Sequence, residues 1–161
     1  MKWTIQQLRK IQTFPYHFET TLDFKELAAQ VSDIIDIHDV KVTGQIIRID
    51  DETYRFKYNV HAPLVLECAK TLDPVDYLFE KDYDEVYSVE ENDEYFLIEK
   101  NTIDLFVMVW SNILIEKPIN VTLENADEIL KERGIILDDT ELLDDDEEIL
   151  FYSDGLEEDE N

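Results

Sequence analysis

The chain has 161 residues, of which 44% are hydrophobic, and it carries 40 acidic against 14 basic side chains, for a formal net charge of −26 at pH 7. This length and apolar content suit one folded domain with a buried core, and they exclude a chain that is disordered throughout. No apolar run is long enough to span a membrane, no apolar signal segment follows the N-terminal MKWTIQQLRK, and a single cysteine cannot form an internal disulfide, so we expect a cytoplasmic protein with no membrane partner.

The N-terminal residues predict two short helices with a strand between them. Thr4 and Gln7 have the spacing of a capping box, which predicts a helix over residues 3–12. Asp23 and Glu26 repeat this start signal, which predicts a second helix over FKELAAQV. The intervening FPYHFETTLD is expected to form a strand.

The next segments predict a long hairpin. Residues 40–49 begin as an alternating strand, and a shift in the apolar phase predicts a bulge near Gly44. Over residues 54–68 the even positions are apolar and most odd positions are polar, which indicates a strand with one buried face. This face consists of Tyr54, Phe56, Tyr58, Val60, Ala62, Leu64, Leu66 and Cys68. Pro74 ends the pattern, and VDYLF at 75–79 predicts a returning partner strand.

Residues 103–116 predict a helix, with Asn101 or Thr102 as the N-cap and Pro118 as the stop signal. One side of this helix contains Ile103, Phe106, Val107, Trp110, Ile113 and Leu114. Its other side is apolar too, so the helix either forms the centre of the core or also offers a face to a partner.

The remaining elements complete the predicted fold. EYFLI at 94–98 predicts a further strand, and NADEILKERG predicts a last helix that begins after Asn125 and ends at Gly134. Together these elements predict an α+β fold, in which helices cover an antiparallel sheet with long hairpin strands. We assign this fold to a single globular domain over residues 1–137.

The acidic residues are concentrated at the C-terminus. Residues 138–161 contain thirteen acidic side chains and no basic one, whereas residues 1–137 contain 27 acidic and 14 basic side chains. Such a run is usually a solvated tail, because like charges repel one another, but apolar residues within it leave an interaction tail as the alternative. Those residues are Leu142, Leu143, Ile149, Leu150 and Phe151. The sequence does not decide whether this acidic tail is ordered.

The overall charge bears on the choice of partner. An acidic body repels a nucleic acid unless its basic side chains gather on one face, so a basic protein is the favoured partner. The densest basic group is Lys2, Arg9 and Lys10 near the N-terminus. On a short helix such a group is either a solvated face or an RNA-binding surface.

The sequence contains no recognisable arrangement of catalytic or metal-ligating residues. The histidines at 17, 38 and 61 lie in different segments without ligand spacing, and three glycines are too few for a phosphate-binding loop. DDDEE at 144–148 lacks the spaced loop of a specific calcium site. Cys68 ends the apolar face of its predicted strand, so we interpret it as a core residue. We therefore expect no enzymatic activity, no metal and no cofactor.

Four segments in a fixed order carry a resemblance to a known family. They are MKWTIQQLRK, ETTLDF, CAKTLDPV after the long strand, and IEKP after the hydrophobic helix. Through them the chain resembles the YceD family of large ribosomal RNA subunit accumulation proteins (domain of unknown function 177), in its Gram-positive form. The resemblance extends over roughly residues 1–118. It implies a bacterial, cytoplasmic, non-enzymatic factor that supports accumulation of 23S ribosomal RNA and ribosome biogenesis.

The same resemblance bears on metal binding. Many members of the family have a C-x-x-C pair at the position of Cys68 and further cysteines later in the chain, a pattern that implies a metal site. In this sequence Thr71 stands where the second cysteine would be, and no later cysteine follows. Because a structural zinc site needs four ligands, we expect no zinc here.

The leading hypothesis is a factor that binds a basic ribosomal protein or assembly partner and shields its Lys and Arg side chains. The predicted partner-binding residues are Lys70, Thr71, Leu72, Asp73 and Pro74 in one turn and Asp144, Asp145, Asp146, Glu147 and Glu148 in the tail. The alternative is direct binding of precursor ribosomal RNA through Lys2, Arg9 and Lys10. A remote alternative is a hydrolase or an enzyme that uses the thiol of Cys68.

Overall fold

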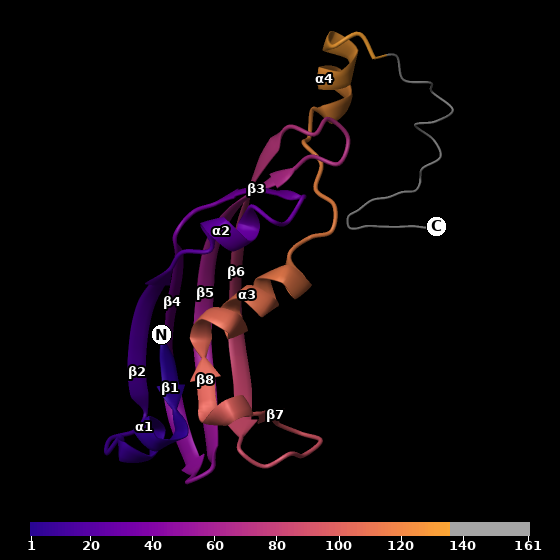
Figure 1. Ribbon diagram of the computed structural model, residues 1–161. Helices are drawn as coiled ribbons and strands as arrows, with labels where there is room; N and C mark the ends of the chain where they lie inside the picture. The colour runs from indigo at the N-terminus through magenta and orange to yellow at the C-terminus, as the bar shows by residue number, and fades with distance from the viewer. Residues whose placement is uncertain (136–161) are drawn as a thin grey trace. The chain divides into compact units, whose positions relative to one another are not determined.

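The computed structural model describes residues 1–135, which form two compact units (Figure 1). Unit 1 comprises Met1–Glu67 and Pro74–Ile119, and unit 2 comprises Cys68–Asp73 with the described residues from Asn120 onward. The predicted boundary between a globular domain, residues 1–137, and an acidic tail, residues 138–161, lies outside the described residues.

Unit 1 contains the predicted antiparallel sheet, and the α+β class is confirmed. The strands of the six-stranded sheet are β2 (Tyr16–Leu22), β3 (Ile34–Ile37), β4 (Val40–Asp50), β5 (Thr53–Glu67), β6 (Pro74–Ser88) and β7 (Phe96–Leu97). Their order is β2-β4-β5-β6-β7, with β3 paired to β5, and only the β6–β7 pair is parallel. A separate pair joins β1 (Lys2–Thr4) to β8 (Thr102–Asp104). β5 and β6 form a long hairpin with 15 residues in each strand, and β5 is the central strand of the sheet.

The helices are short, with one exception. Unit 1 contains α1 (Ile5–Lys10), α2 (Lys25–Ala28), a 3₁₀ turn at Glu99–Asn101 and α3 (Leu105–Glu116), and unit 2 contains α4 (Ala126–Glu132). The predicted capping box of α1 is confirmed, because Gln7 N donates to Thr4 Oγ1 at 3.1 Å and Thr4 N donates to Gln7 Oε1 at 2.9 Å. The predicted end of α4 is confirmed too, because Gly134 follows it with a φ of +83°.

The period-two pattern of β5 correctly identifies the buried face of the sheet. All its even-numbered residues from Tyr54 to Leu66 are buried, and α3 lies across the same face (Figure 1). Asn112 on α3 donates to the Tyr58 hydroxyl at 2.9 Å, which fixes the helix to the middle of β5. At one end of this face the rings of Trp3, Phe18 and Phe56 pack together, with centroids 5.3 and 5.5 Å apart.

The predicted helix is confirmed as α3, and its buried side differs in part from the apolar side named from the sequence. Its buried residues are Leu105, Val109 and Ile113, whereas Val107 is 56% exposed and Leu114 is exposed as well. The helix starts late because the residues before it form β8, and Asp104 Oδ1 accepts a hydrogen bond from the first turn. Because this helix is apolar on every side, its sequence does not indicate which side faces the core.

The predicted bulge near Gly44 is wrong. Pairing between β4 and β5 is continuous through Gly44, and the register shifts between Arg48 and Asp50 instead. Glycine is required at position 44 for a different reason. A Cβ there would lie 2.4 Å from the backbone oxygen of Lys57 and 2.5 Å from Cβ of Tyr58. Only a residue without a side chain allows β4 and β5 to approach this closely.

A network of tyrosines and a glutamate also links β6 to the rest of unit 1. Glu85 Oε1 accepts hydrogen bonds from the hydroxyls of Tyr58 at 2.7 Å and Tyr87 at 3.0 Å, and Asn112 donates to its other oxygen at 3.3 Å. Burial and the adjacent Glu85 carboxylate both raise the pKa of Tyr58 and of Tyr87 well above the ordinary value. Both hydroxyls donate their proton to Glu85, so these hydrogen bonds require Tyr58 and Tyr87 to be protonated.

We expect Tyr58 and Tyr87 to stay protonated as the pH rises through about 10, and to ionise only as the protein unfolds. Because the folded state raises both pKa values, their stabilising effect is complete below the ordinary tyrosine pKa and is lost as the pH rises above it. An absorbance titration of the wild type beside Tyr58→Phe and Tyr87→Phe checks this. Each variant should lose part of the late-ionising fraction, and early ionisation of all eight tyrosines would contradict the expectation.

Candidate functional site

All of the predicted partner-binding turn except Pro74 belongs to unit 2. Residues Cys68–Asp73 belong to unit 2, and Pro74 begins β6 in unit 1. Within unit 2 the turn is closed by hydrogen bonds from Cys68 N to Asp73 O at 2.8 Å and from Leu72 N to Cys68 O at 2.9 Å. Leu72 adopts a φ of +65° and is 65% exposed, so it is the apolar tip of this turn.

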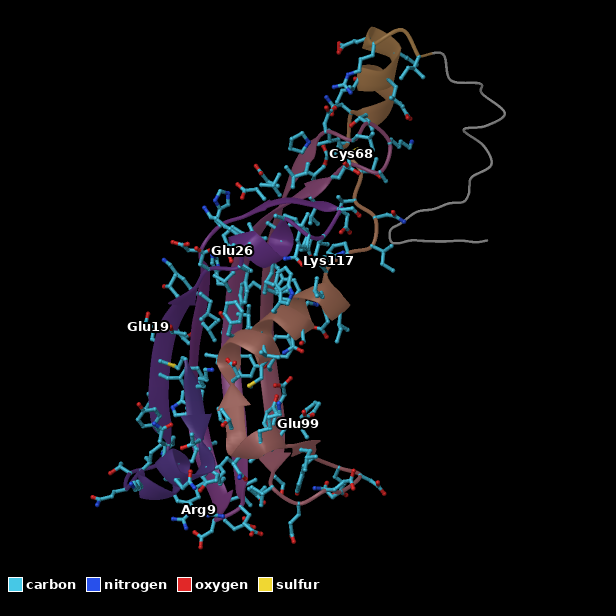
Figure 2. All side chains as sticks on the ribbon, viewed as in Figure 1. Arg9, Glu19, Glu26, Cys68, Glu99 and Lys117 are labelled. Atoms are coloured by element: carbon cyan, nitrogen blue, oxygen red, sulfur yellow. The ribbon has the colours of Figure 1, made fainter. Side chains whose placement is uncertain are left out.

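Cys68, labelled in Figure 2, is fully buried, as a core residue should be. Its sulfur accepts hydrogen bonds from Thr71 N and Leu123 N, each at 3.5 Å. Burial alone would raise the pKa of the thiol, but hydrogen bonds from Thr71, Leu123 and Lys70 outweigh it and lower the pKa. Since no atom of Cys68 is accessible, the thiol lacks the exposure that a nucleophile requires.

Ion pairs attach α4 to the same turn. Arg133 donates two hydrogen bonds to the carboxylate of Asp73, at 2.9 and 2.7 Å, and one to Thr71 O at 3.3 Å. Lys70 Nζ lies 3.0 Å from Asp127 Oδ1. Two charged members of the predicted partner-binding set, Lys70 and Asp73, therefore already have partners within unit 2. The side chains of both pairs are partly exposed, so each pair contributes modestly, and the bidentate Arg133–Asp73 pair is the stronger.

Arg133→Met should loosen α4, because it removes three hydrogen bonds and leaves Asp73 without its cation. We expect several-fold faster amide exchange across α4, with β5 unaffected. The matched control is Lys131→Met, which removes the same charge from an exposed position of the same helix.

Acid should have a similar effect on the wild type. Hydrogen bonds from Arg133 lower the pKa of Asp73, so its stabilising effect is present above the ordinary pKa of about 4 and is lost as the pH falls through the lowered value. The quantity to compare is the protection factor of the α4 amides, which corrects for the intrinsic effect of pH on exchange. Protection factors that are the same in both variants, and independent of pH in this range, would refute the role of the pair.

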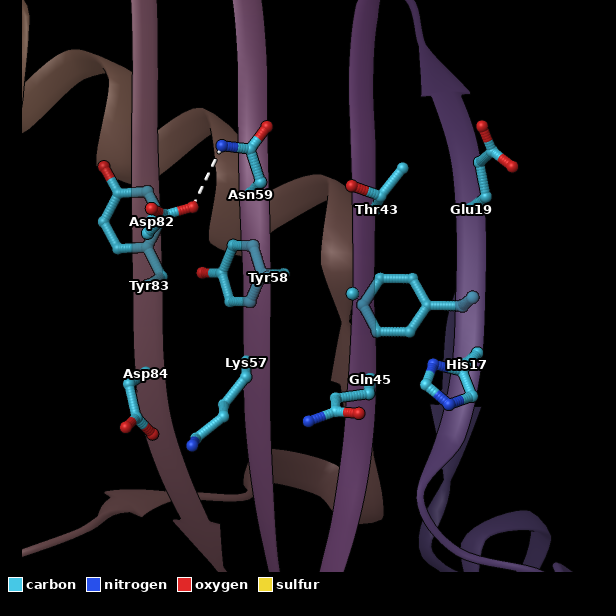
Figure 3. A pocket seen from close by; sticks show the side chains of 12 residues that line it. His17, Glu19, Thr43, Gln45, Lys57, Tyr58, Asn59, Asp82, Tyr83 and Asp84 are labelled. Carbon is cyan, nitrogen blue, oxygen red and sulfur yellow. Dashed lines mark hydrogen bonds between the residues drawn. The ribbon is translucent and has the colours of Figure 1, made fainter.

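The face of the sheet opposite α3 carries many polar side chains (Figure 3). The hydroxyls of Tyr58 and Tyr83 bond to α3, so by strand alternation the residues next to them in β5 and β6 point to the other face. A depression of about 830 Å³ lies over this face. The polar side chains that line it are His17 and Glu19 on β2, Thr43 and Gln45 on β4, Lys57 and Asn59 on β5, and Asp82 and Asp84 on β6.

One strand of this face is acidic. We call the exposed carboxylates on the open face of β6 the β6 acidic stripe; it comprises Asp76, Glu80, Asp82 and Asp84. Three of them have cross-strand partners on β5: Arg55 binds Asp84 with two bonds of 2.7 Å, Asn59 Nδ2 donates to Asp82 at 3.0 Å, and His61 Nδ1 lies 3.1 Å from Glu80. The hydrogen bonds from Arg55 lower the pKa of Asp84. This stripe is absent from the predicted binding residues, although acids at alternate positions were a signal for it.

The N-terminal basic residues lie on the surface of unit 1, and one of them bonds to the backbone of another segment. Lys2, Arg9 and Lys10 are all exposed. Arg9, labelled in Figure 2, donates to the backbone oxygen of Asp51 at 3.1 Å, in the turn between β4 and β5. The other predicted acidic site, Asp144–Glu148, lies outside the described residues.

Two further observations concern residues 1–135 only. In that part of the chain, no group of three or more His, Cys, Asp or Glu side chains is arranged to hold a metal ion. No helix described there is long and apolar enough to cross a membrane.

The chain is similar to a protein of Bacillus subtilis. The uncharacterized protein YlbN of Bacillus subtilis (strain 168) is 32% identical over 133 residues, which cover 80% of this chain and 77% of YlbN. No family model matches the chain. No solved structure matches it either. On the strength of that identity and coverage, the chain belongs to the same family as Bacillus subtilis YlbN.

Proposed function

We propose that this protein is a non-enzymatic, cytoplasmic factor of ribosome biogenesis that supports accumulation of 23S ribosomal RNA by binding a basic ribosomal protein or a basic assembly partner. The observation that carries the proposal is the distribution of charge. Residues 1–137 carry 27 acidic against 14 basic side chains, and residues 138–161 add thirteen more acids. The resemblance to the YceD family supplies the ribosomal context.

The physical role of such a charge is to hold a basic protein. Free ribosomal proteins with dense Lys and Arg side chains bind polyanions indiscriminately, because counterion release drives that binding. An acidic partner competes for these side chains and speeds encounter with them. Release then requires only that the correct RNA offers more contacts.

The test is affinity capture of the tagged protein from lysate of its own organism, at low and moderate salt, with and without ribonuclease. We expect a basic large-subunit ribosomal protein or assembly factor that stays bound after ribonuclease and dissociates as salt rises. Capture that does not depend on salt would sink the electrostatic mechanism.

The same experiment separates the RNA-binding alternative. Large-subunit precursor RNA that stays bound at moderate salt, and that is lost in an Arg9→Glu, Lys10→Glu double variant, would replace the proposed function with direct RNA binding. A variant that ends at residue 137 is the control, because it should retain RNA in that case but capture less basic protein.

A further inference from the structure

β6 is the outermost long strand of the sheet. On one side it pairs with β5 along its whole length, but on the other β7 pairs only with Tyr87 and Ser88 (Figure 1). Between residues 75 and 86, no strand within the described part of the chain pairs with this second side. Such an edge is a template for one more strand.

The backbone of every second residue of β6 faces this free edge. Ser88 O accepts a hydrogen bond from Ile98 N at 2.8 Å on the β7 side, so the backbone groups of Ser88 point outward. In an antiparallel pair these groups alternate in direction from residue to residue. The residues that face the free edge are therefore Asp76, Leu78, Glu80, Asp82, Asp84 and Val86.

The same residues carry the β6 acidic stripe on the open face of the sheet. An added strand would place alternate side chains directly opposite these carboxylates, at about 5 Å between Cβ atoms. Its other side chains would meet the opposite face, where Tyr77 and Tyr83 are half-buried and Phe79 is buried. The sequence that fits is extended, with basic and apolar residues in alternation.

A second copy of this chain does not fit the edge. Symmetric antiparallel pairing of two β6 strands about Glu80 would place Glu80 opposite Glu80 and Asp76 opposite Asp84. Like charges directly opposite each other destabilise a strand pair. At the other end of the sheet, β2 has Glu19 as its single acidic residue, so charge distinguishes the two ends.

We propose that the free edge of β6 binds an extended basic segment of a partner protein by β-strand addition, with Lys or Arg of the segment facing Glu80, Asp82 and Asp84. This inference rests on the proposed function and specifies how that partner is held. Backbone hydrogen bonds supply the affinity, and the acidic stripe selects the partner by charge. The existing pairs with β5 do not prevent this, because the carboxylates of Glu80 and Asp84 remain about half exposed.

The test uses the full chain and a synthetic peptide of alternating Lys and Val residues. We expect saturable binding in which the amides of Leu78, Glu80 and Asp82 gain protection from hydrogen exchange. The amides of Phe79, Lys81 and Tyr83 point to β5 and should not change. Equal protection of odd and even residues, or protection elsewhere, would overturn strand addition.

A second peptide separates hydrogen bonding from charge. N-methylation of alternate residues removes the donors along one edge of the peptide and leaves its charge unchanged. Strand addition predicts a loss of affinity of about 100-fold, from about three lost hydrogen bonds. Equal affinity of the two peptides would mean that only charge acts, and would overturn the proposal.

Variants of the protein test the choice of edge. Glu80→Gln with Asp82→Asn removes two charges and keeps groups that can still bond to β5, so affinity should fall about five-fold. The matched control is Glu19→Gln on β2, which should leave affinity unchanged. If Glu19→Gln lowers the affinity for the peptide more than the double variant does, the peptide binds at the β2 edge and the proposal is overturned.

Failure of this inference is distinguishable from failure of the proposed function. If the double variant captures the basic ribosomal protein from lysate as well as the wild type does, the function stands and the β6 edge is not the site. If the wild type captures no such protein but binds the peptide at β6 with alternating protection, strand addition stands and the ribosomal role does not.

Discussion

Replacing Gly44 with valine should destabilise unit 1 by about 3 kcal/mol or more, at the upper end of the range for overpacking. The added side chain cannot avoid a clash, because its Cβ alone would lie 2.4 Å from a backbone oxygen of the paired strand. Backbone in the middle of a sheet cannot move without breaking the ladder between β4 and β5. Denaturant unfolding followed by circular dichroism measures the loss.

Two controls separate this clash from other effects of substitution. Thr43→Ala changes the neighbouring exposed residue and should alter stability by less than about 1 kcal/mol. Gly134→Ala meets no atom within 4 Å, but its φ of +83° strains any side chain, so about 1 kcal/mol should be lost at the end of α4 alone. If Gly44→Val and Thr43→Ala unfold at the same denaturant concentration, the close approach of the two strands is wrong.

Phe56→Ala should lower the free energy of unfolding by about 3–5 kcal/mol, the usual range for a buried phenylalanine. The ring of Phe56 is fully buried and lies 5.5 Å from Trp3 and 5.6 Å from Tyr87, measured between centroids. Its removal leaves a cavity between β1, β5 and β6, which contribute these rings. Because a domain is stable by only about 5–15 kcal/mol, a large part of the total is lost.

The matched control is Phe96→Ala. This ring also stacks on Tyr87, at 5.1 Å, but it is 55% exposed, so its removal should cost about 1 kcal/mol or less. Thermal unfolding of both variants, with Trp3 and Trp110 as fluorescent probes, provides the comparison. Equal losses would show that the Trp3–Phe56 contact does not form the core.

Local signals in the sequence were sufficient for several elements. The capping box of α1, the buried face of β5 and the glycine after α4 each depend on residues within a few positions of one another. Such signals follow from backbone geometry, so they hold in any fold that contains the segment. The burial of Cys68 belongs with them, since a free cysteine behaves as a small apolar residue.

The candidate binding surface depends on contacts between distant segments. The alternate spacing of Glu80 and Asp82 places them on one face of a strand. Only the strand order of the folded sheet puts that strand beside an unpaired edge. The partners of Lys70 and Asp73 lie about 60 residues further along the chain. No residue close to them in the sequence therefore indicates that both form ion pairs within unit 2.

The sequence by itself determined the α+β class, the strands and helices with clear periodicity, and the acidic character of the chain. The tertiary structure decided which side of α3 is buried, because an all-apolar helix takes its phase from what it packs against. It also decided why residue 44 is glycine, because the clash involves a strand more than ten residues away. These features arise from non-local packing, which no window of local sequence contains.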